Sequence, residues 1–545
     1  MNHSNHRIIE RDYVELDTDL RAIATRHHLR RPWWIPGDVV RGIFRNGMGP
    51  TVSIAGTTLF ERRLLQMMMP AISLVAAAAF WAFAEWRLGL LLSLAIAILQ
   101  DPLRKLTPDQ PVIFVVFTGV AFAAACLGAW AQDVPFTPTS IFGRERRAAM
   151  PMWLLLALII LQALNSLLRL GNPVITSIGL LTYLLPLPAI IFAYQLVRLG
   201  GEARIYQFMT AYLVLTVLAL ATVYLEYLGY DASVFGQVGH NLLIFDNGGI
   251  IVPHSGIFRS SETAAWHAMT CACFALLLVT LREFNFLRLL SAAIIVVLLI
   301  GIGILTGRRK TVVEVMVFAS SYFILWFVLQ KGVEKLGIVL AIAGLVGFGW
   351  LSGQLNDRPV YVDQETLSYY RYVDRVGTVF EDVPVRVREL GIAPIMWAYD
   401  TFGFFGAGLG VGTQGTQYFG GGGSIAGAAE GGLGKITLEL GIPGLVLIGW
   451  LAILLLNYLW RIMRDASLVS PRLARLSYGL FSFLVANIAA FSVATQAFGD
   501  IFILLILSWT LGFLFAVPVL LEREMRARQP AIFEQPARVL GPKTV

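Results

Sequence analysis

Charged residues are scarce in this sequence. They make up 14% of its 545 residues, against roughly 25% in ordinary soluble domains. Hydrophobic residues make up 57%, and the mean hydropathy is +0.69. Because a soluble protein of this length needs many more charges to cover its surface, the composition excludes a soluble enzyme and a disordered chain. It indicates a polytopic membrane protein.

Cysteine is nearly absent, and histidine offers no metal-binding pattern in its place. The three cysteines, Cys126, Cys271 and Cys273, all lie inside apolar runs, so we expect neither a disulfide framework nor a metal site. His254 and His267 match no zinc-ligand spacing and are interpreted as solvated or internally satisfied. The net charge of +7 comes without a basic block interleaved with aromatics, so no nucleic-acid partner and no cofactor are predicted.

Long apolar runs are abundant. Since a helical crossing needs about 20 apolar residues, the runs predict an all-α, polytopic membrane helix bundle of about 12 crossings. Two runs are irregular, because 87–99 is short and 436–457 contains Glu439. We interpret 87–99 as a half-crossing or as part of a re-entrant hairpin with 66–84. The runs are 66–84, 87–99, 111–130, 151–168, 173–197, 208–229, 263–281, 289–306, 311–330, 336–351, 436–457, 478–498 and 501–521.

The distribution of arginine predicts the orientation and the domain organisation. The first 63 residues carry ten Arg and no Lys, which is typical of a cytoplasmic arm. Both termini are expected in the cytoplasm and 231–262 on the outer side, and the resemblance described below implies that the membrane is a bacterial inner membrane. The predicted parts are the N-terminal arm 1–63, the transmembrane bundle 64–351, a long extracytoplasmic catalytic loop 352–435, the C-terminal transmembrane helices 436–521 and the cytoplasmic tail 522–545.

Arginine also occurs where the positive-inside rule disfavours it. Arg308 and Arg309 interrupt two apolar runs, and the predicted orientation puts them at the outer face. Arg259 precedes the helix expected at 263–281 on the same face. Guanidinium groups bind phosphate bidentately and stay charged at any relevant pH. These arginines predict a diphosphate-binding site, and the alternative is that they only cap helix ends.

The long loop adds four arginines to the diphosphate hypothesis. Arg371 and Arg375 are four residues apart, so they share one face of the helix expected around 366–390. Arg386 and Arg388 follow in the same stretch. The loop 352–435 as a whole carries five Arg and one Lys against nine Asp and Glu. A network of solvated salt bridges is therefore the alternative for each single arginine.

Two carboxylates are candidate catalytic groups. Glu439 lies inside an apolar run, where an acidic side chain is a functional candidate by default. Glu430 comes just before that run. Either carboxylate could accept the proton of an acceptor hydroxyl. For Glu439 a structural ion pair is an equally good interpretation.

Three short motifs occur in a fixed order along the second half of the chain. They are Gly256-Ile257-Phe258, Thr306-Gly307-Arg308-Arg309 and, after the glycine-rich end of the long loop, Leu438-Glu439-Leu440-Gly441-Ile442-Pro443-Gly444. In order, spacing and expected side of the membrane, they resemble the superfamily of O-antigen ligases and Wzy-type polysaccharide polymerases. Those proteins are integral-membrane glycosyltransferases of the GT-C type. The resemblance covers residues 200–520.

The resemblance implies a donor, an acceptor and a role for arginine. The implied donor is an undecaprenyl-diphosphate-linked glycan, and the acceptor is a second glycan. The diphosphate ligands would be Arg308 or Arg309, and less directly the loop arginines from Arg371 to Arg388. Arginine supplies the positive charge, so no metal is required. Ligases of the superfamily carry a His-Asn pair just before the last loop-closing helix, whereas this sequence has Glu430-Gly431 there, a departure that favours a polymerase.

We therefore expect polymerisation of undecaprenyl-diphosphate-linked oligosaccharide repeat units into surface polysaccharide or exopolysaccharide, by metal-independent inverting transfer. The alternative in the same class is ligase-type transfer of the glycan to a lipid or protein acceptor. The alternative of another class is a secondary transporter or flippase. The sequence shows no internal repeat and concentrates charge at the outer boundary, which fits a transporter less well. The arm 1–63 is a candidate contact for a chain-length regulator.

Overall fold

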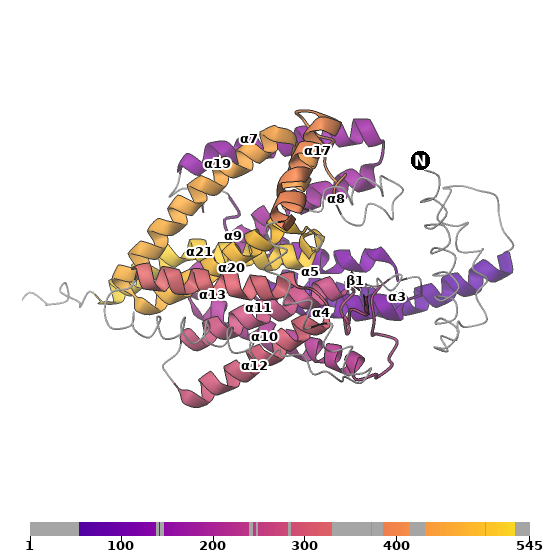
Figure 1. The fold of residues 1–545 in the computed structure, drawn as a ribbon, viewed down its shortest axis with the longest axis horizontal. Coiled ribbons are helices and arrows are strands. Elements are labelled where there is room, and N and C mark those ends of the chain that lie inside the picture. The colour runs from indigo at the N-terminus through magenta and orange to yellow at the C-terminus, as the bar shows by residue number, and fades with distance from the viewer. Residues whose placement is uncertain are drawn as a thin grey trace, which may run out of the picture. The chain divides into compact units, whose positions relative to one another are not determined.

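The computed structural model divides into two compact units, Met1–Leu65 and Gln66–Val545. The described residues are helical apart from their connections and one antiparallel hairpin of β1 (Ile244–Asp246) and β2 (Gly249–Ile251) (Figure 1). The predicted helical class is confirmed for this part of the chain. The structure describes residues 54–108, 110–137, 141, 146–238, 244–246, 249–281, 285–329, 372, 385–413, 431–495 and 497–528.

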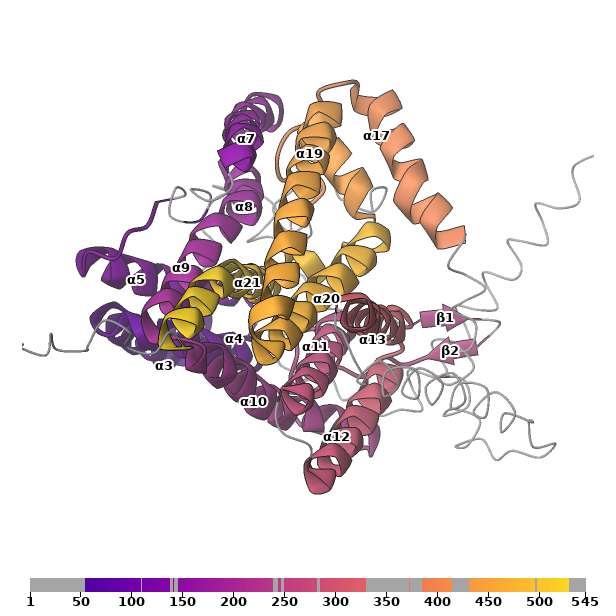
Figure 2. The same cartoon turned by 90° about the vertical axis from the view of Figure 1, so that its left-hand side faces the viewer.

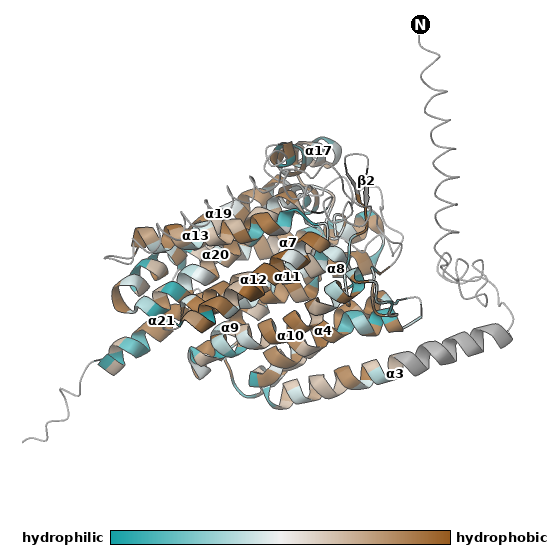
Figure 3. Ribbon diagram, turned by 60° about the horizontal axis from the view of Figure 1, so that its bottom comes forward, coloured by the Kyte–Doolittle hydropathy of each residue, from teal (hydrophilic) through white to brown (hydrophobic). Residues whose placement is uncertain are grey.

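In these described residues, 11 helical segments are long and apolar enough to cross a membrane. Figure 3 shows hydrophobic residues along their length. The crossing count of the whole chain stays a prediction, because the run 336–351 lies outside the described residues. The helices in these segments are α4 (Gly89–Leu106), α5 (Phe117–Ala131), α7 (Ala149–Leu170), α8 (Pro173–Leu184) with α9 (Pro186–Gly200), α10 (Ala203–Tyr227), α11 (Ser261–Thr280), α12 (Phe286–Leu305), α13 (Lys310–Leu329), α19 (Gly432–Val469), α20 (Pro471–Val493) and α21 (Ile501–Arg528). They are preceded by α3 (Ile54–Ala84).

Capping residues and prolines begin several of these helices. The Asn172 side chain accepts the N–H of Val174 at 3.0 Å, and Pro173 fills the first helical position of α8. The Ser260 hydroxyl accepts the N–H of Thr263 at 3.2 Å and starts α11. Such caps satisfy N–H groups that a helix start leaves without a partner.

The helix α11 lies at the centre of the hydrophobic core. Its Phe274 packs with Phe208 of α10, and Phe208 packs with Trp509 of α21, with ring centroids 6.1 and 5.7 Å apart. All three side chains are fully buried. The residues that lead into α11 are therefore anchored to the most tightly enclosed helix of the bundle.

The helix α4 differs from the sequence prediction. The short run 87–99 predicts a half-crossing or part of a re-entrant hairpin with 66–84. The helix α4 continues beyond this run and, with the preceding turn, is long and apolar enough to cross, and whether it crosses stays a prediction. Its last turns carry Asp101 and Lys105, which are both buried. The Lys105 ammonium donates to the carbonyl oxygens of Gly256 and Phe258 at 2.8 and 2.5 Å. The helix extends past the apolar run because its lysine finds protein acceptors instead of water.

Polar contacts define two ends of the bundle. At the arginine-rich end, Arg523 of α21 donates to the carbonyl oxygen of Arg198 in α9, and Arg475 of α20 donates to that of Thr280 in α11 at 2.9 Å. At the opposite end, Lys105 joins α4 to the residues before α11. The segments that meet at the arginine-rich end are those that the arginine pattern assigns to one side. Which face of the membrane each end occupies stays a prediction.

The helix α19 is interrupted at Gly441. The φ angle there is 71°, a left-handed conformation in which a side chain is strained. A Cβ atom at this position would lie 2.4 Å from the carbonyl oxygen of Phe404. Beside α19 lies α17 (Ala393–Phe402), which continues the π-helical turn η4 (Val387–Ile392) (Figure 2). The break lets residues 403–413 pass against α19.

Candidate functional site

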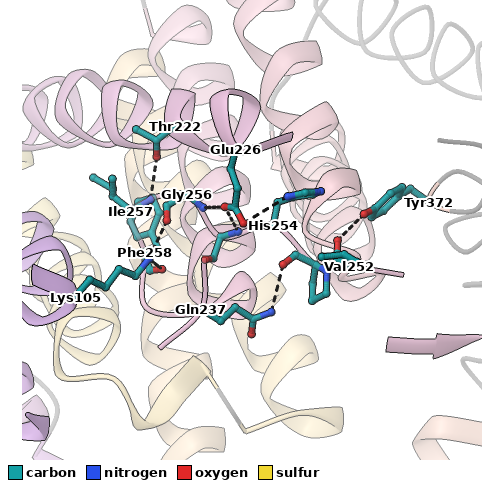
Figure 4. Close-up of polar contacts among 12 residues, drawn as sticks. Lys105, Thr222, Glu226, Gln237, Val252, His254, Gly256, Ile257, Phe258 and Tyr372 are labelled. Carbon is teal, nitrogen blue, oxygen red and sulfur yellow. Dashed lines mark hydrogen bonds and ion pairs between the residues drawn. The ribbon is translucent and has the colours of Figure 1, made fainter. Parts of the chain in front are cut away.

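Residues 252–262 lead into α11 and include its first two residues, Ser261 and Glu262. This stretch, here called the pre-α11 segment, is contacted by polar side chains from distant parts of the sequence. These side chains come from α4, from α10, from residues 308–310 before α13 and from Asp500 before α21. Figure 4 shows the part of the cluster around α4 and α10. The segment therefore positions the candidate site, and α11 holds the segment.

The backbone of the pre-α11 segment is fixed by α10. The Glu226 carboxylate accepts the N–H groups of Ser255 and Gly256 at 2.9 and 2.5 Å. The Thr222 hydroxyl accepts the N–H of Ile257 at 3.0 Å. Gly256 has a φ of 56°, and a Cβ atom there would lie 2.3 Å from the Thr222 hydroxyl oxygen. Only glycine fits this turn, which gives the motif at 256–258 a structural reason.

Arg259 is held between two carboxylates. Its N–H donates to Asp101 at 2.9 Å, and its guanidinium lies 2.9 Å from Asp500. The Arg259 side chain is 19% exposed and that of Asp500 only 1%. Asp500 also accepts the N–H of Phe502 at 2.7 Å, so it caps α21 as well. The carboxylates thus lie deeper than the arginine and compensate its charge from the inner side.

Arg308 and Lys310 share one carboxylate. The Arg308 guanidinium lies 3.3 Å from Glu262, and its Nε donates to the Ser261 hydroxyl at 3.2 Å. Lys310 forms an ion pair with the same carboxylate. Burial lowers the pKa of Arg308 from its ordinary value, and the nearby Glu262 favours its charged form. Glu262 is again more buried than either cation.

His254 lies between α10 and Tyr372 (Figure 4). Its Nδ1 is 3.5 Å from Glu226, and both side chains keep partial exposure. The Tyr372 hydroxyl donates to the carbonyl oxygen of Val252 at 2.5 Å. Burial, with Tyr227 and Glu226 nearby, raises the pKa of Tyr372 to about 12, so this hydroxyl stays protonated. An imidazole backed by a carboxylate is a suitable proton acceptor.

The structure brings some predicted site residues together and separates others. Arg259 belongs to the pre-α11 segment and Arg308 donates to Ser261 of the same segment, and Arg309 is the partly buried residue next to Arg308. Arg386 and Arg388 are exposed at η4, which packs on α19 and α20. The remaining predicted site residues, Arg371, Arg375 and Glu430, lie outside the described residues.

Glu439 is placed as a structural carboxylate. Its side chain is fully buried, and it accepts hydrogen bonds from the Tyr183 hydroxyl, the Gly412 N–H and the Thr413 hydroxyl at 2.8, 3.0 and 2.9 Å. Both oxygens are used, so Glu439 joins α8 to the 403–413 segment and to α19. These contacts support a structural role through hydrogen bonds with neutral donors, and both the ion pair and the catalytic role of Glu439 stay predictions.

Sequence reasoning missed several residues of the cluster. Asp101 and Lys105 resemble the ordinary polar end of an apolar run, and Asp500 resembles a short connection between two runs. Glu226 lies at the end of its run. For Glu226 and Asp500 the available signal was their position at the ends of runs that the predicted orientation places on the outer side, but that orientation does not extend to Asp101 and Lys105.

Two more ionisable side chains are buried inside the spans. His267 of α11 has its Nδ1 2.7 Å from the Tyr212 hydroxyl. In the described part of the bundle, the Nε2 of His267 and one oxygen of Glu314 in α13 have no hydrogen-bond partner. Ionisable groups inside a membrane are costly and are candidates for function. The described residues contain no group of three His, Cys, Asp or Glu that could hold a metal ion.

Compared with known proteins, no family model matches the chain, and no curated protein matches its sequence.

Proposed function

We propose that this chain is a membrane glycosyltransferase that polymerises undecaprenyl-diphosphate-linked oligosaccharide repeat units at the outer face of a bacterial inner membrane. The observation that carries the proposal is that the pre-α11 segment holds two cations and one imidazole. Arg259 belongs to the segment and pairs with Asp500, Arg308 donates to Ser261 of the segment, and His254 lies beside the Glu226 carboxylate. Arg259 and Arg308 are paired with the more buried carboxylates of Asp500 and Glu262. Their exposed sides are therefore suited to bind an anionic group.

Glycosyl transfer requires two groups from the protein, a cation for the departing diphosphate and an acceptor for the hydroxyl proton. A bond forms between an acceptor hydroxyl oxygen and the anomeric carbon, while the bond from that carbon to the diphosphate oxygen breaks. Arg259 and Arg308 would stabilise the negative charge that develops on the departing diphosphate. His254 would accept the hydroxyl proton, with Glu226 stabilising the resulting imidazolium. Attack opposite the leaving group inverts the anomeric carbon.

The acceptor decides between polymerase and ligase. A growing glycan as acceptor gives a polymer on lipid, whereas a different lipid or a protein as acceptor gives ligase-type transfer. The same diphosphate and proton chemistry serves both. We favour polymerisation because Glu430-Gly431 replaces the His-Asn pair expected of a ligase.

Secondary transport or lipid flipping is a second candidate function. The observation that favours it is the break of α19 at Gly441, together with buried His267 and Glu314 inside the spans. Interrupted helices and intramembrane ionisable groups are typical of transporters. Against it, both oxygens of Glu439 next to the break are hydrogen bonded, which stabilises one conformation.

Purified protein in liposomes with a lipid-diphosphate-linked repeat unit tests the proposal. Wild type should lengthen the glycan, and Arg308→Ala with Arg309→Ala should abolish lengthening while the protein still folds. The matched control is Arg472→Ala, an exposed arginine at the opposite end of the bundle. If wild type moves the lipid-linked unit across the bilayer without lengthening it, the transporter is right. If glycan passes to a non-glycan acceptor only, the protein is a ligase.

A further inference from the structure

The helix α17 lies across the direction of the spans. Figure 1 shows its axis at a steep angle to those of α11, α13 and α20, and Figure 2 shows it at the edge of the bundle beside α19. Its inner face is formed by Pro394 and Ala398, which are buried. Pro394 touches Gly434 near the start of α19, because a Cβ atom on that glycine would lie 2.3 Å from it. The helix is therefore fixed to the bundle by one face only.

A second face of α17 carries an exposed apolar stripe. Ile392, Met396 and Tyr399 are 55%, 58% and 45% exposed. They are spaced by four and three residues, so they lie along one side of the helix. Asp400, four residues after Met396, is exposed at the edge of this stripe, and Thr401, nine residues after Ile392, is exposed on the opposite, polar side of the helix. The helix thus has a buried face, an apolar exposed face and a polar exposed face.

The apolar stripe continues into the membrane-facing surface of α19. Phe404 and Phe405 follow α17 and are both exposed. The carbonyl oxygen of Phe404 accepts the N–H of Ile442 at 3.0 Å, directly after the break of α19. Further along α19, Val446 and Ile453 are exposed apolar residues of a candidate span, which is where a spanning helix meets lipid. Because the apolar stripe of α17 is continuous with that surface of α19, we expect the stripe to meet lipid as well.

Charge on the preceding turn matches the same location. Arg386 and Arg388 of the 385–402 segment are exposed. Helices that lie in the interface of a membrane place apolar residues in the acyl boundary and basic residues at the phosphate level. Arginine does this well because its guanidinium binds phosphate while its stem packs on apolar surface.

We propose that η4 and α17 form an interfacial helix that binds the phospholipid bilayer, with Ile392, Met396 and Tyr399 in the acyl boundary and Arg386 and Arg388 on lipid phosphates. This inference does not depend on glycosyl transfer. It assigns the two arginines to the bilayer instead of to the diphosphate of a substrate.

Site-specific fluorescence in nanodiscs that hold one copy of the full chain tests the proposal. The background is Cys126→Ala, because Cys271 and Cys273 are buried and unreactive. A single cysteine at Met396→Cys carries an environment-sensitive dye, and Thr401→Cys is the matched control on the opposite side of the same helix. With lipids that carry a quencher near the top of the acyl chain, we expect several-fold stronger quenching at 396 than at 401. Ile392→Cys, compared with the same control, repeats the measurement at a second position of the stripe.

Two results would overturn the proposal. One is equal access of a water-soluble iodide quencher to positions 396 and 401, because the stripe would then face water. The other is a dye at 396 that is shielded only in discs containing two copies, because the stripe would then bind a second chain.

A second measurement tests the arginines. In discs containing phosphatidylglycerol, amide hydrogen exchange of residues 385–402 should be several-fold slower than in pure phosphatidylcholine, and Arg386→Gln with Arg388→Gln should remove this difference. An unchanged difference in the variant would contradict phosphate binding by this pair. Slower exchange on adding a soluble diphosphate, with no dependence on lipid charge, would assign the arginines to a substrate instead.

Discussion

The carboxylate of Asp500 lies 2.9 Å from the guanidinium of Arg259 and joins the start of α21 to the start of α11. Asp101 accepts the N–H of the same arginine, which adds α4 to the junction. Three helices that are distant in sequence therefore meet through one cation at one end of the bundle. The pair organises the candidate site and also stabilises the fold, so its two roles require separate measurements.

We predict that Asp500→Asn destabilises the protein by up to about 3 kcal/mol, because it removes the carboxylate that pairs with the largely buried guanidinium of Arg259. Asparagine retains an oxygen that can cap α21 through the N–H of Phe502, so the change isolates the charge. The thermal unfolding midpoint in one detergent measures the effect. Asp465→Asn is the control, because its ion pair with Arg464 is exposed and should contribute less than about 1 kcal/mol. Equal midpoints for the two variants would contradict a stabilising role for the Asp500 pair.

We predict that His254→Gln lowers the rate of glycan lengthening by at least about 100-fold, the lower limit for loss of a general base. The KM for the lipid-linked donor should change little, because the arginines remain. Glu226→Gln keeps an oxygen for the N–H groups of Ser255 and Gly256 but loses the charge, so we expect a smaller loss of rate.

Two comparisons separate proton transfer from a structural role of His254. Added imidazole should restore part of the rate to His254→Ala, since a diffusible base replaces the missing one. Tyr372→Phe removes only the hydrogen bond to Val252 and should lengthen glycan at close to the wild-type rate. A wild-type rate for His254→Gln would exclude it as the base.

Much of the helical fold was predictable because lipid leaves few alternatives. An apolar run of sufficient length must satisfy its own backbone groups, so the runs 263–281 and 289–306 correspond closely to α11 and α12. The contact of Arg523 with Arg198 places two of the arginines that the pattern assigns to one side at the same end of the bundle, and the side of the membrane that this end faces stays a prediction. Hydropathy could not predict the true length of α4, because the partners of Lys105 lie in a distant segment.

The candidate site was less accessible to sequence reasoning. Arg259 and Arg308 could be selected because positive charge is unexpected on the outer side, and the structure places both at the pre-α11 segment. The carboxylates that brace them, such as Asp500, could not be assigned, since a pairing between distant segments leaves no local pattern. For the same reason, the contacts of Glu439 with α8 and with residues 412–413 could not be predicted.

The break in α19 leads to a prediction about stability. Gly441→Ala should destabilise the protein by at least about 2 kcal/mol, because alanine is strained at a positive φ and its Cβ would overlap the carbonyl oxygen of Phe404. Gly449→Ala in the same helix is the matched control, since a Cβ atom there meets nothing within 4 Å. The control should be neutral or slightly stabilising, as expected for alanine in a regular helix. Equal unfolding midpoints for the two variants would show that the break is not required.

Substitutions of Glu439 distinguish a structural carboxylate from a catalytic one. Glu439→Ala removes the acceptor of three hydrogen bonds, those donated by Tyr183, Gly412 and Thr413, so we expect a loss of about 2–4 kcal/mol in the free energy of unfolding. Glu439→Gln keeps one oxygen for Gly412 and Thr413, and its amide can donate to the Tyr183 oxygen. For a structural role, the glutamine variant should therefore retain most of the stability and most of the glycan-lengthening rate.

If Glu439→Gln kept the wild-type unfolding midpoint but lost lengthening by about 100-fold or more, as removal of a general base would cause, Glu439 would be the catalytic carboxylate. The hydrogen bonds to residues 412–413 would then serve to orient it for proton transfer.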